Sequence, residues 1–364
     1  MRNVAWYLAM SCLVLVATAC SGGAPEVAQQ PIESPTTIAP AAPTSTVTPP
    51  TATAEPRSGV LDGLIELASG FEEVAVWGRD PGGVSFEGPN GLTIDGEGSI
   101  YVTEFSGGHL RKFAPDGELL FEVGGTGNAA GRLGNPIGVA VDLDGTIYVS
   151  ESGTSRVSMF AADGSFRSSF GEFGGEPGQF RSAMGIAVNE ASKIFVADFG
   201  NHRVQVFDRS GGLIRSWGEL GSEPGQFNNP IGLQLGPAGN VWVVDSANER
   251  VQVFGQDGEL VRVFADVGPG PQVLSVNAAG EFYVASPWAE SRVRHFDAEG
   301  NLLGTVGLSV SDTELAQMSS AERREAGNLP RLNGPHGTAT DSSGAVYMAD
   351  TANGVVRKFA PTGG

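Results

Sequence analysis

The arrangement of residues 185–217 constrains the fold most, because the same arrangement recurs along the chain. Four short runs of alternating apolar residues occupy positions 185–189, 193–198, 203–207 and 213–217, and Gly, Asp, Asn or Ser separates each from the next. Period-two alternation in β-branched and aromatic residues predicts four antiparallel strands joined as a meander. The stretch is therefore one structural unit of a repeating chain.

The apolar pair at the centre of the second predicted strand marks each copy of this unit. It begins at six positions: Tyr101, Tyr148, Phe195, Trp242, Tyr283 and Tyr347. The first four are 47 residues apart, and the last two follow after 41 and 64 residues. Four strands at a period in the forties are typical of a propeller blade, and each blade must stack on its neighbours to bury both faces. We therefore predict an all-β, six-bladed β-propeller with four-stranded antiparallel blades.

The two ends of the domain are expected to complete one blade together. The sixth copy stops after its third predicted strand, Val355–Phe359, and no fourth strand follows it. An unassigned strand-like run, Glu73–Gly78, lies before the first copy and resembles residues 214–218. If the last blade takes its outer strand from this N-terminal run, the ring has no open edge.

The unit closely resembles the NHL repeat. The best match is Val196-Ala-Asp-Phe-Gly-Asn-His-Arg-Val-Gln-Val-Phe207, with a near twin ending at Phe254 and with Glu-Pro-Gly-Gln-Phe linkers at 176–180 and 223–227. The resemblance covers about residues 58–364 and implies a propeller. It leaves the function open, because this fold hosts interaction modules and enzymes alike.

The N-terminus has the pattern of an export signal. A mostly apolar run ends in Ala17-Thr-Ala-Cys20, which resembles the lipobox of bacterial lipoproteins. The resemblance implies a signal peptide at 1–19 and a lipid on Cys20, and ordinary secretion with cleavage near Ala19 is the alternative. Residues 20–57 are rich in Pro, Thr and Ala and predict a disordered tether. We expect an extracytoplasmic protein, lipid-anchored to a bacterial membrane.

Charge and cysteine content exclude several classes of partner and cofactor. The 364 residues carry a formal net charge of −19, which argues against nucleic acid as a partner and favours a monomer that resists self-association. The two cysteines, Cys12 and Cys20, both lie in the N-terminal segment, so the domain has neither a disulfide framework nor a cysteine-based zinc site. No cofactor is expected.

An acid and an arginine five residues apart flank the loop between the second and third strands in three copies. The pairs are Glu151 with Arg156, Asp198 with Arg203, and Asp245 with Arg250. One hypothesis is a structural clamp, in which carboxylate and guanidinium meet across the loop. The other is a ring of guanidinium groups facing a ligand, with Arg203 and Arg250 as candidates. Three copies depart from the pattern: Glu104 with His109, Ser286 with Arg292, and Asp350 with Val355.

Non-repeating residues gather on one predicted face of the ring. Because strand direction alternates, the loops from second to third strand share a face with the crossings between blades, and we call this the crossover face. It carries Phe105, Phe199, Trp288 and His336, while Gln234 replaces a small residue near the axis. An insertion at 309–330 has two capping-box patterns, at Ser311 and Ser319, with Gly327 as a helix stop. The insertion either covers the gap between two blades or acts as a lid.

Asp-Gly pairs on the opposite face are interpreted as hairpin turns rather than calcium loops, since no closing glutamate follows them.

No complete catalytic set is recognisable. Pro335-His336-Gly337 resembles a zinc-ligand segment of the peptide-amidating lyase family, but no second histidine occupies the equivalent position in another copy. Zinc catalysis needs about three protein ligands and an open position. We therefore hypothesise a non-catalytic, envelope-anchored platform that binds a protein, peptide or glycan. The alternative is a metal-dependent propeller hydrolase or lyase with its site near His336.

Overall fold

The computed structural model describes residues 59–68, 70–78, 85–329 and 331–362. The predicted signal peptide, Cys20 and the tether lie outside the described residues. Among the described residues, no helix is both long and apolar enough to cross a membrane.

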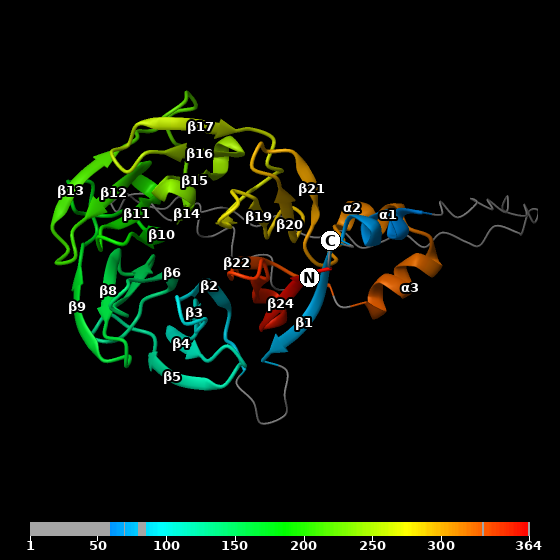
Figure 1. Ribbon diagram of the computed structural model, residues 1–364, viewed down its shortest axis with the longest axis horizontal. Helices are drawn as coiled ribbons and strands as arrows, with labels where there is room; N and C mark the ends of the chain where they lie inside the picture. Colours follow the sequence, from blue (N-terminus) through cyan, green and yellow to red (C-terminus); the bar gives the residue numbers. More distant parts are fainter. Residues whose placement is uncertain (1–58, 69, 79–84, 330, 363–364) are drawn as a thin grey trace, which may run out of the picture. The chain divides into compact units, whose positions relative to one another are not determined.

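The strands form six four-stranded antiparallel sheets arranged as a ring of blades (Figure 1), which confirms the predicted fold class. In each blade the first strand lies nearest the axis and the fourth at the rim. Blade 1 consists of β2 (Pro89–Ile94), β3 (Ile100–Glu104), β4 (His109–Phe113) and β5 (Leu119–Gly124). Blade 2 consists of β6 (Pro136–Val141), β7 (Ile147–Glu151), β8 (Arg156–Phe160) and β9 (Phe166–Phe170). Blade 3 consists of β10 (Ala183–Val188), β11 (Ile194–Asp198), β12 (Arg203–Phe207) and β13 (Leu213–Trp217).

The remaining blades follow the same order. Blade 4 consists of β14 (Pro230–Leu235), β15 (Val241–Asp245), β16 (Arg250–Phe254) and β17 (Leu260–Phe264). Blade 5 consists of β18 (Val273–Val276), β19 (Phe282–Ser286), β20 (Arg292–Phe296) and β21 (Leu302–Thr305). Blade 6 consists of β22 (Pro335–Thr340), β23 (Val346–Asp350), β24 (Val355–Pro361) and β1 (Phe71–Trp77). Short 3-10 turns are η1 (Phe199–Asn201), η2 (Pro237–Gly239), η3 (Ser246–Asn248) and η4 (Thr351–Asn353).

Strand β1 closes the ring as the sequence predicts. It runs antiparallel to β24, with Phe71 opposite Pro361 and Trp77 opposite Val356, and the two strands lie side by side in Figure 1. The Trp77 ring stacks on Tyr347 of β23 with centroids 5.9 Å apart. The outer strand of blade 6 therefore comes from the N-terminal side of the domain, which satisfies the backbone groups of what would otherwise be an exposed edge.

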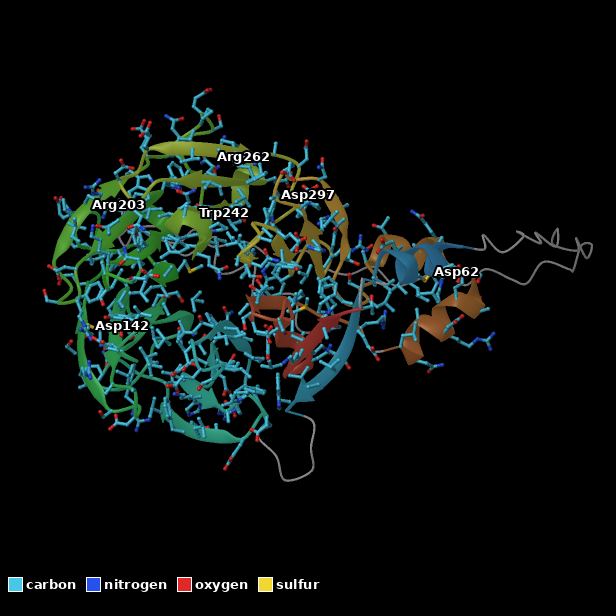
Figure 2. The ribbon with its side chains drawn as sticks, in the orientation of Figure 1. Asp62, Asp142, Arg203, Trp242, Arg262 and Asp297 are labelled. Carbon is cyan, nitrogen blue, oxygen red and sulfur yellow. The ribbon has the colours of Figure 1, made fainter. Side chains whose placement is uncertain are left out.

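The core consists of six apolar clusters, one between each pair of adjacent blades. Every second strand is fully buried along its length, whereas fourth strands such as β13 are mostly exposed. Trp242, visible among the side chains of Figure 2, fills the space between blades 4 and 5. Because each blade buries both of its faces against neighbours, β-branched and aromatic residues occupy consecutive positions in the second strands.

Glycine on the first strand lets the blades approach closely around the axis. A Cβ atom on Gly91 would lie 2.0 Å from the carbonyl oxygen of Ile137, and one on Gly337 would lie 2.0 Å from that of Asn90. Equivalent glycines occur at 138, 185 and 232, whereas blade 5 has Val273. In blades 1, 2, 3, 4 and 6 the neighbouring first strand therefore lies too close for a side chain at this position.

The insertion forms two helices, α2 (Asp312–Gln317) and α3 (Ser320–Asn328), each beginning at a complete capping box. Helix α3 continues through Gly327 to Asn328, so the predicted stop at that glycine is wrong. A further helix, α1 (Val60–Leu67), precedes β1, and its Leu61 and Leu64 form one apolar cluster with Met318 and Ala326. The insertion thus holds the N-terminal helix of the domain.

Candidate functional site

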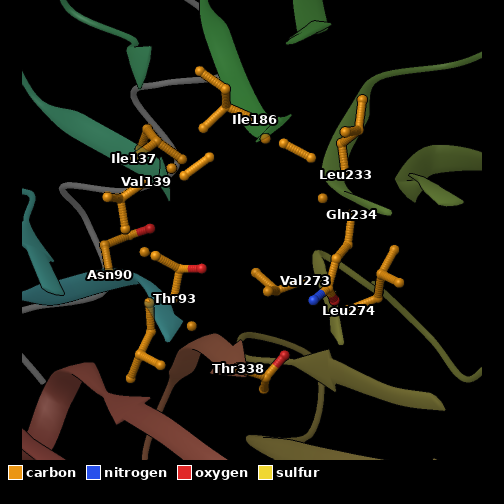
Figure 3. A pocket seen from close by; sticks show the side chains of 18 of the residues that line it. Asn90, Thr93, Ile137, Val139, Ile186, Leu233, Gln234, Val273, Leu274 and Thr338 are labelled. Carbon is orange, nitrogen blue, oxygen red and sulfur yellow. The ribbon is translucent and has the colours of Figure 1, made fainter. Parts of the chain in front are cut away.

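A cavity of about 210 Å³ lies at the axis, enclosed by the first strands of all six blades. Most of the residues that line it are aliphatic or glycine, and its polar lining residues include Asn90, Thr93, Gln234 and Thr338 (Figure 3). The hydroxyl of Thr338 is buried without a hydrogen-bond partner among the described residues. A buried hydroxyl of this kind commonly binds a water molecule or a ligand group.

His336 lies at the crossover-face end of this cavity. It is the second residue of β22, is 8% exposed, and lines the cavity. Its Nδ1 lies 2.8 Å from the carbonyl oxygen of Gly334, which fixes the proton on Nδ1 and leaves a lone pair on Nε2. Burial lowers the pKa of His336 to about 4, so the ring is neutral at physiological pH. His336 can therefore accept a hydrogen bond or bind one metal ion through Nε2.

Trp288 and His336, which the sequence analysis singled out separately, are brought together by the fold. Trp288 lies in the loop between β19 and β20 and is 51% exposed. Its ring meets that of His336 edge to face, with centroids 4.6 Å apart. A half-exposed indole beside a buried imidazole forms an amphipathic rim at one side of the cavity mouth.

Phe105 and Phe199 lie on the same face in blades 1 and 3. Each donates its backbone N–H to the residue just before a first strand, Gly88 for Phe105 and Ser182 for Phe199. Both side chains are half-buried. In this position blades 2, 4 and 6 carry Ser152, Ser246 and Thr351. Blade 5 has Pro287 there, one residue before Trp288, so aromatic and hydroxyl side chains alternate only from blade 1 to blade 4.

Gln234 lies at the axis, but its side chain already has a structural partner. Its Oε1 accepts the backbone N–H of Val276 over 3.0 Å, which joins β14 to β18. Blade 5 is the blade in which Val273 replaces the glycine of the other first strands. The long polar side chain thus links the first strands of blades 4 and 5.

The arginines of blades 2, 3 and 4 form ion pairs across their loops. Nε of Arg156 lies 3.0 Å from Glu151, that of Arg203 lies 2.8 Å from Asp198, and that of Arg250 lies 2.7 Å from Asp245. Arg203 also donates to the carbonyls of Glu176 and Gln179, and Arg250 to those of Ser222, Glu223 and Gln226. These contacts occupy the guanidinium groups, so the geometry favours the clamp over the ligand-facing ring.

Blades 1 and 6 keep the clamp with an arginine that the sequence analysis missed. Arg111 lies 2.6 Å from Glu104, and Arg357 lies 2.6 Å from Asp350, each arginine seven residues after the acid. Positions five and seven after the acid lie on one face of the third strand, because side chains alternate along a strand. In blades 2, 3 and 4 the second of these positions holds Ser158, Gln205 and Gln252, which also bond the acid. The alternation of side chains along the third strand could therefore have identified Arg111 and Arg357 as clamp residues.

Blade 5 lacks the acid and takes its carboxylates from elsewhere. Ser286 occupies the acid position, and Arg292 opposite it donates to both carboxylate oxygens of Glu314, at 2.7 and 2.8 Å. Arg294 pairs with Glu290 of the same loop. Glu314 is also the capping residue of α2, so the insertion is tied to blade 5 by this ion pair.

The turns between first and second strands on the opposite face are closed by the aspartate that follows the first strand. Oδ1 of Asp142 accepts the N–H groups of Asp144 and Thr146, and its Oδ2 accepts the hydroxyl of Tyr148. Asp95 and Asp341 make the same contacts in blades 1 and 6. Within the described ranges, no group of three or more His, Cys, Asp or Glu side chains could hold a metal ion.

Comparison with known proteins agrees with this geometry at the level of the repeat. Residues 180–207 and 227–254 each match the NHL repeat family. A search of curated proteins gave no match.

Several solved structures share the fold. A streptogramin B lyase superposes with a TM-score of 0.56 at 14% identity, over 81% of this chain and 99% of the lyase. A catalytically inactive histidine-to-alanine variant of virginiamycin B lyase from Staphylococcus aureus, with quinupristin, gives 0.52 at 14% identity over 80% and 98%. A gluconolactonase from Xanthomonas campestris gives 0.54 at 15% identity over 76% and 87%. Likeness at such low identity concerns the fold alone. The chain is thus a six-bladed β-propeller that contains NHL repeats.

Proposed function

We propose that this propeller is a non-catalytic binding platform, anchored at the cell envelope by a lipid on Cys20 and working outside the cytoplasm as a monomer. Its ligand is a protein, peptide or glycan bound at the mouth of the axial cavity. The observation that carries this proposal is the pairing of half-exposed Trp288 with buried, neutral His336 at that mouth.

The size of the cavity supports a ligand that lies on the face and inserts one group. Pockets that enclose a whole small molecule have volumes of about 300–1,000 Å³, whereas this cavity has about 210 Å³. A side chain or a single sugar hydroxymethyl group fits such a space. The inserted group would present an N–H or O–H donor to Nε2 of His336.

The aromatic residues support the same arrangement outside the cavity. Trp288 offers a flat apolar surface of the kind that dominates interface energies when it becomes desolvated. Phe105 and Phe199 extend the aromatic character to blades 1 and 3 of the same face. The clamp arginines, Arg203 and Arg250, are left out of this proposed site, because their guanidinium groups are engaged within the clamps.

Capture from envelope extract tests this proposal. The purified protein, Trp288→Ala and Leu143→Ala would be immobilised and exposed to the same extract. Leu143 is a matched control, since it is an 80% exposed apolar residue in an Asp-Gly turn of the opposite face. We expect Trp288→Ala to lose its ligand at least ten-fold and Leu143→Ala to keep it. Equal retention by both variants would refute binding at the mouth.

The second candidate is a hydrolase or lyase with its reactive group at His336. It is favoured by the fixed Nδ1 proton and the Nε2 lone pair at the cavity, which suit a general base or a metal ligand. The enzymes among the similar folds are compatible with it. Stoichiometric zinc or calcium in the purified protein, lost in His336→Ala, would support the metal-dependent enzyme and overturn the platform.

A further inference from the structure

Four crossings between blades share one structural position. In each, a residue just after the fourth strand forms a single parallel bridge to a residue just before the next blade: Thr126 to Leu133, Phe173 to Phe180, Leu220 to Phe227, and Leu308 to Arg331. In the first three bridges the second residue is fully buried. The first residues, namely Thr126, Phe173, Leu220 and Leu308, are therefore equivalent positions on the crossover face.

At Leu308 the chain covers this position with helices. The crossing from blade 5 to blade 6 is the one that contains α2 and α3. Leu308 packs against the cluster formed by Leu61 and Leu64 of α1 with Met318 and Ala326. Leu61 and Leu64 are spaced three apart on one side of α1, while Ile65 faces outward at 41% exposure. An amphipathic helix is thus the element that buries an apolar residue here.

At the next two equivalent positions the apolar residue is uncovered. Phe173 is 67% exposed and Leu220 is 62% exposed. Their loops are held firmly: the Gln179 side chain donates to Glu172 and accepts from the Glu176 N–H, and Gln226 makes the same two bonds with Glu219 and Glu223. Each apolar side chain is therefore presented to solvent on a preorganised loop.

Acidic residues surround both exposed side chains. Glu172 and Glu176 flank Phe173, and Glu219 and Glu223 flank Leu220, all of them exposed. The first loop has Arg181 beside it, whereas the second has Asn228 at the same position. The second loop also borders a shallow hollow lined by Glu219, Glu223 and Gln226. A partner that covers these residues needs positive charge.

We propose that Phe173 and Leu220 form a docking surface for an amphipathic helix of a partner protein. Its apolar side covers the two residues as α1 and the insertion cover Leu308, and its flanks carry lysine or arginine facing the four glutamates. The acidic surroundings disfavour an anionic membrane surface as the occupant. This surface belongs to the crossings of blades 2–3 and 3–4, and it is separate from the mouth at Trp288 and His336.

Two synthetic peptides test this surface on the full-length protein. The first is an 18-residue helix with leucines spaced three and four apart on one side and lysines elsewhere, and the second has glutamate in place of every lysine. Affinities would be measured by titration calorimetry at physiological salt. Hydrogen exchange would locate the contact. The double variant Phe173→Ser with Leu220→Ser is matched by Leu143→Ser on the opposite face, and all three sites are exposed, so the variants are expected to fold.

The expected result is that the lysine peptide binds, slows exchange in 172–180 and 219–227, and loses at least ten-fold in affinity with the double variant. Leu143→Ser and Trp288→Ala should leave its affinity unchanged, and the glutamate peptide should not bind. The proposal is overturned if the double variant binds the lysine peptide as tightly as the parent, or if Trp288→Ala rather than the double variant abolishes binding. Equal binding of both peptides would also overturn it.

Discussion

Replacing Arg357 by methionine tests how the ring is closed. Arg357 of β24 is 1% exposed, lies 2.6 Å from Asp350, and also pairs with Glu73 of β1. One guanidinium group therefore joins the second, third and outer strands of the blade in which the chain ends meet. Methionine keeps the apolar stem of the side chain and removes the charge.

The expected loss of unfolding free energy depends on the carboxylate of Asp350, which stays buried without its arginine. Removing one partner of a buried ion pair typically destabilises a protein by about 3–5 kcal/mol, because the other charge stays buried. Asp350 is fully buried and keeps two hydrogen bonds, from the Asn353 amide and the Asn333 N–H. We therefore expect a loss near the lower limit, about 3 kcal/mol, which is a large part of the 5–15 kcal/mol of a typical domain.

The loss should also depend on pH. Burial already raises the pKa of Asp350 above its ordinary value, and the pairing with Arg357 opposes this. Without Arg357 the folded-state pKa rises further. Between the unfolded and folded pKa values the folded state holds a proton that the unfolded state has lost, so stability falls as the pH rises. The variant should thus be less impaired in acid than at neutral pH.

Urea unfolding followed by tryptophan fluorescence measures the free energy of unfolding of the variant. The signal reports on this blade because Trp77 of β1 stacks on Tyr347 of β23. Arg203→Met is the matched control in blade 3, where the pair is 14% exposed on the arginine side and away from blade 6. Adding Asp350→Asn to Arg357→Met should recover part of the loss. A loss below about 1 kcal/mol, typical of an exposed pair, or no recovery in the double variant, would refute the reasoning.

Three further predictions concern other parts of the molecule. Deleting residues 71–78 should abolish cooperative unfolding in circular dichroism, because β24 would lose its partner strand; a cooperative transition in the deletion variant would contradict this. Lowering the pH from 6.5 towards 4 should remove about 3 kcal/mol of stability, because burial keeps His336 neutral while the unfolded state gains a proton, and His336→Gln should lose that slope in denaturant titrations. Glu314→Gln should destabilise α2 by about 1–3 kcal/mol, since both carboxylate oxygens bind Arg292. Hydrogen exchange should then rise in α1 as well, and unchanged protection there would mean that the helices do not depend on the ion pair.

The architecture could be predicted from the sequence because six copies of the repeat show the same pattern of strands and turns. Strand period, turn residues and the spacing of Tyr101, Tyr148 and Phe195 all point to one blade. The closure by β1 could be predicted for the same reason, since a missing strand in the last copy and a spare strand before the first are complementary. Consistency across copies is what made these predictions firm.

The contacts of the insertion could not be predicted in the same way. The two capping boxes locate α2 and α3, because a helix start depends on neighbouring residues. Their packing on α1 brings Leu61 into contact with residues more than 250 positions away, and the repeat pattern does not predict such a contact. The pairing of Trp288 with His336 is of the same kind, because it depends on how far the blade 5 loop reaches across to blade 6.

A residue that departs from the repeat is a candidate for function only if no other residue of the structure takes over the role of the residue that it replaces. The apparent loss of the clamp at Val355 is made good by Arg357, and the missing acid at Ser286 is replaced by Glu314 and Glu290. Gln234 likewise joins β14 to β18, the first strand of blade 5. The exposure of Phe173 and Leu220 has no such explanation in the contacts between the strands of the blades. At these two positions apolar side chains stay exposed, and a partner that covers them would bury apolar surface.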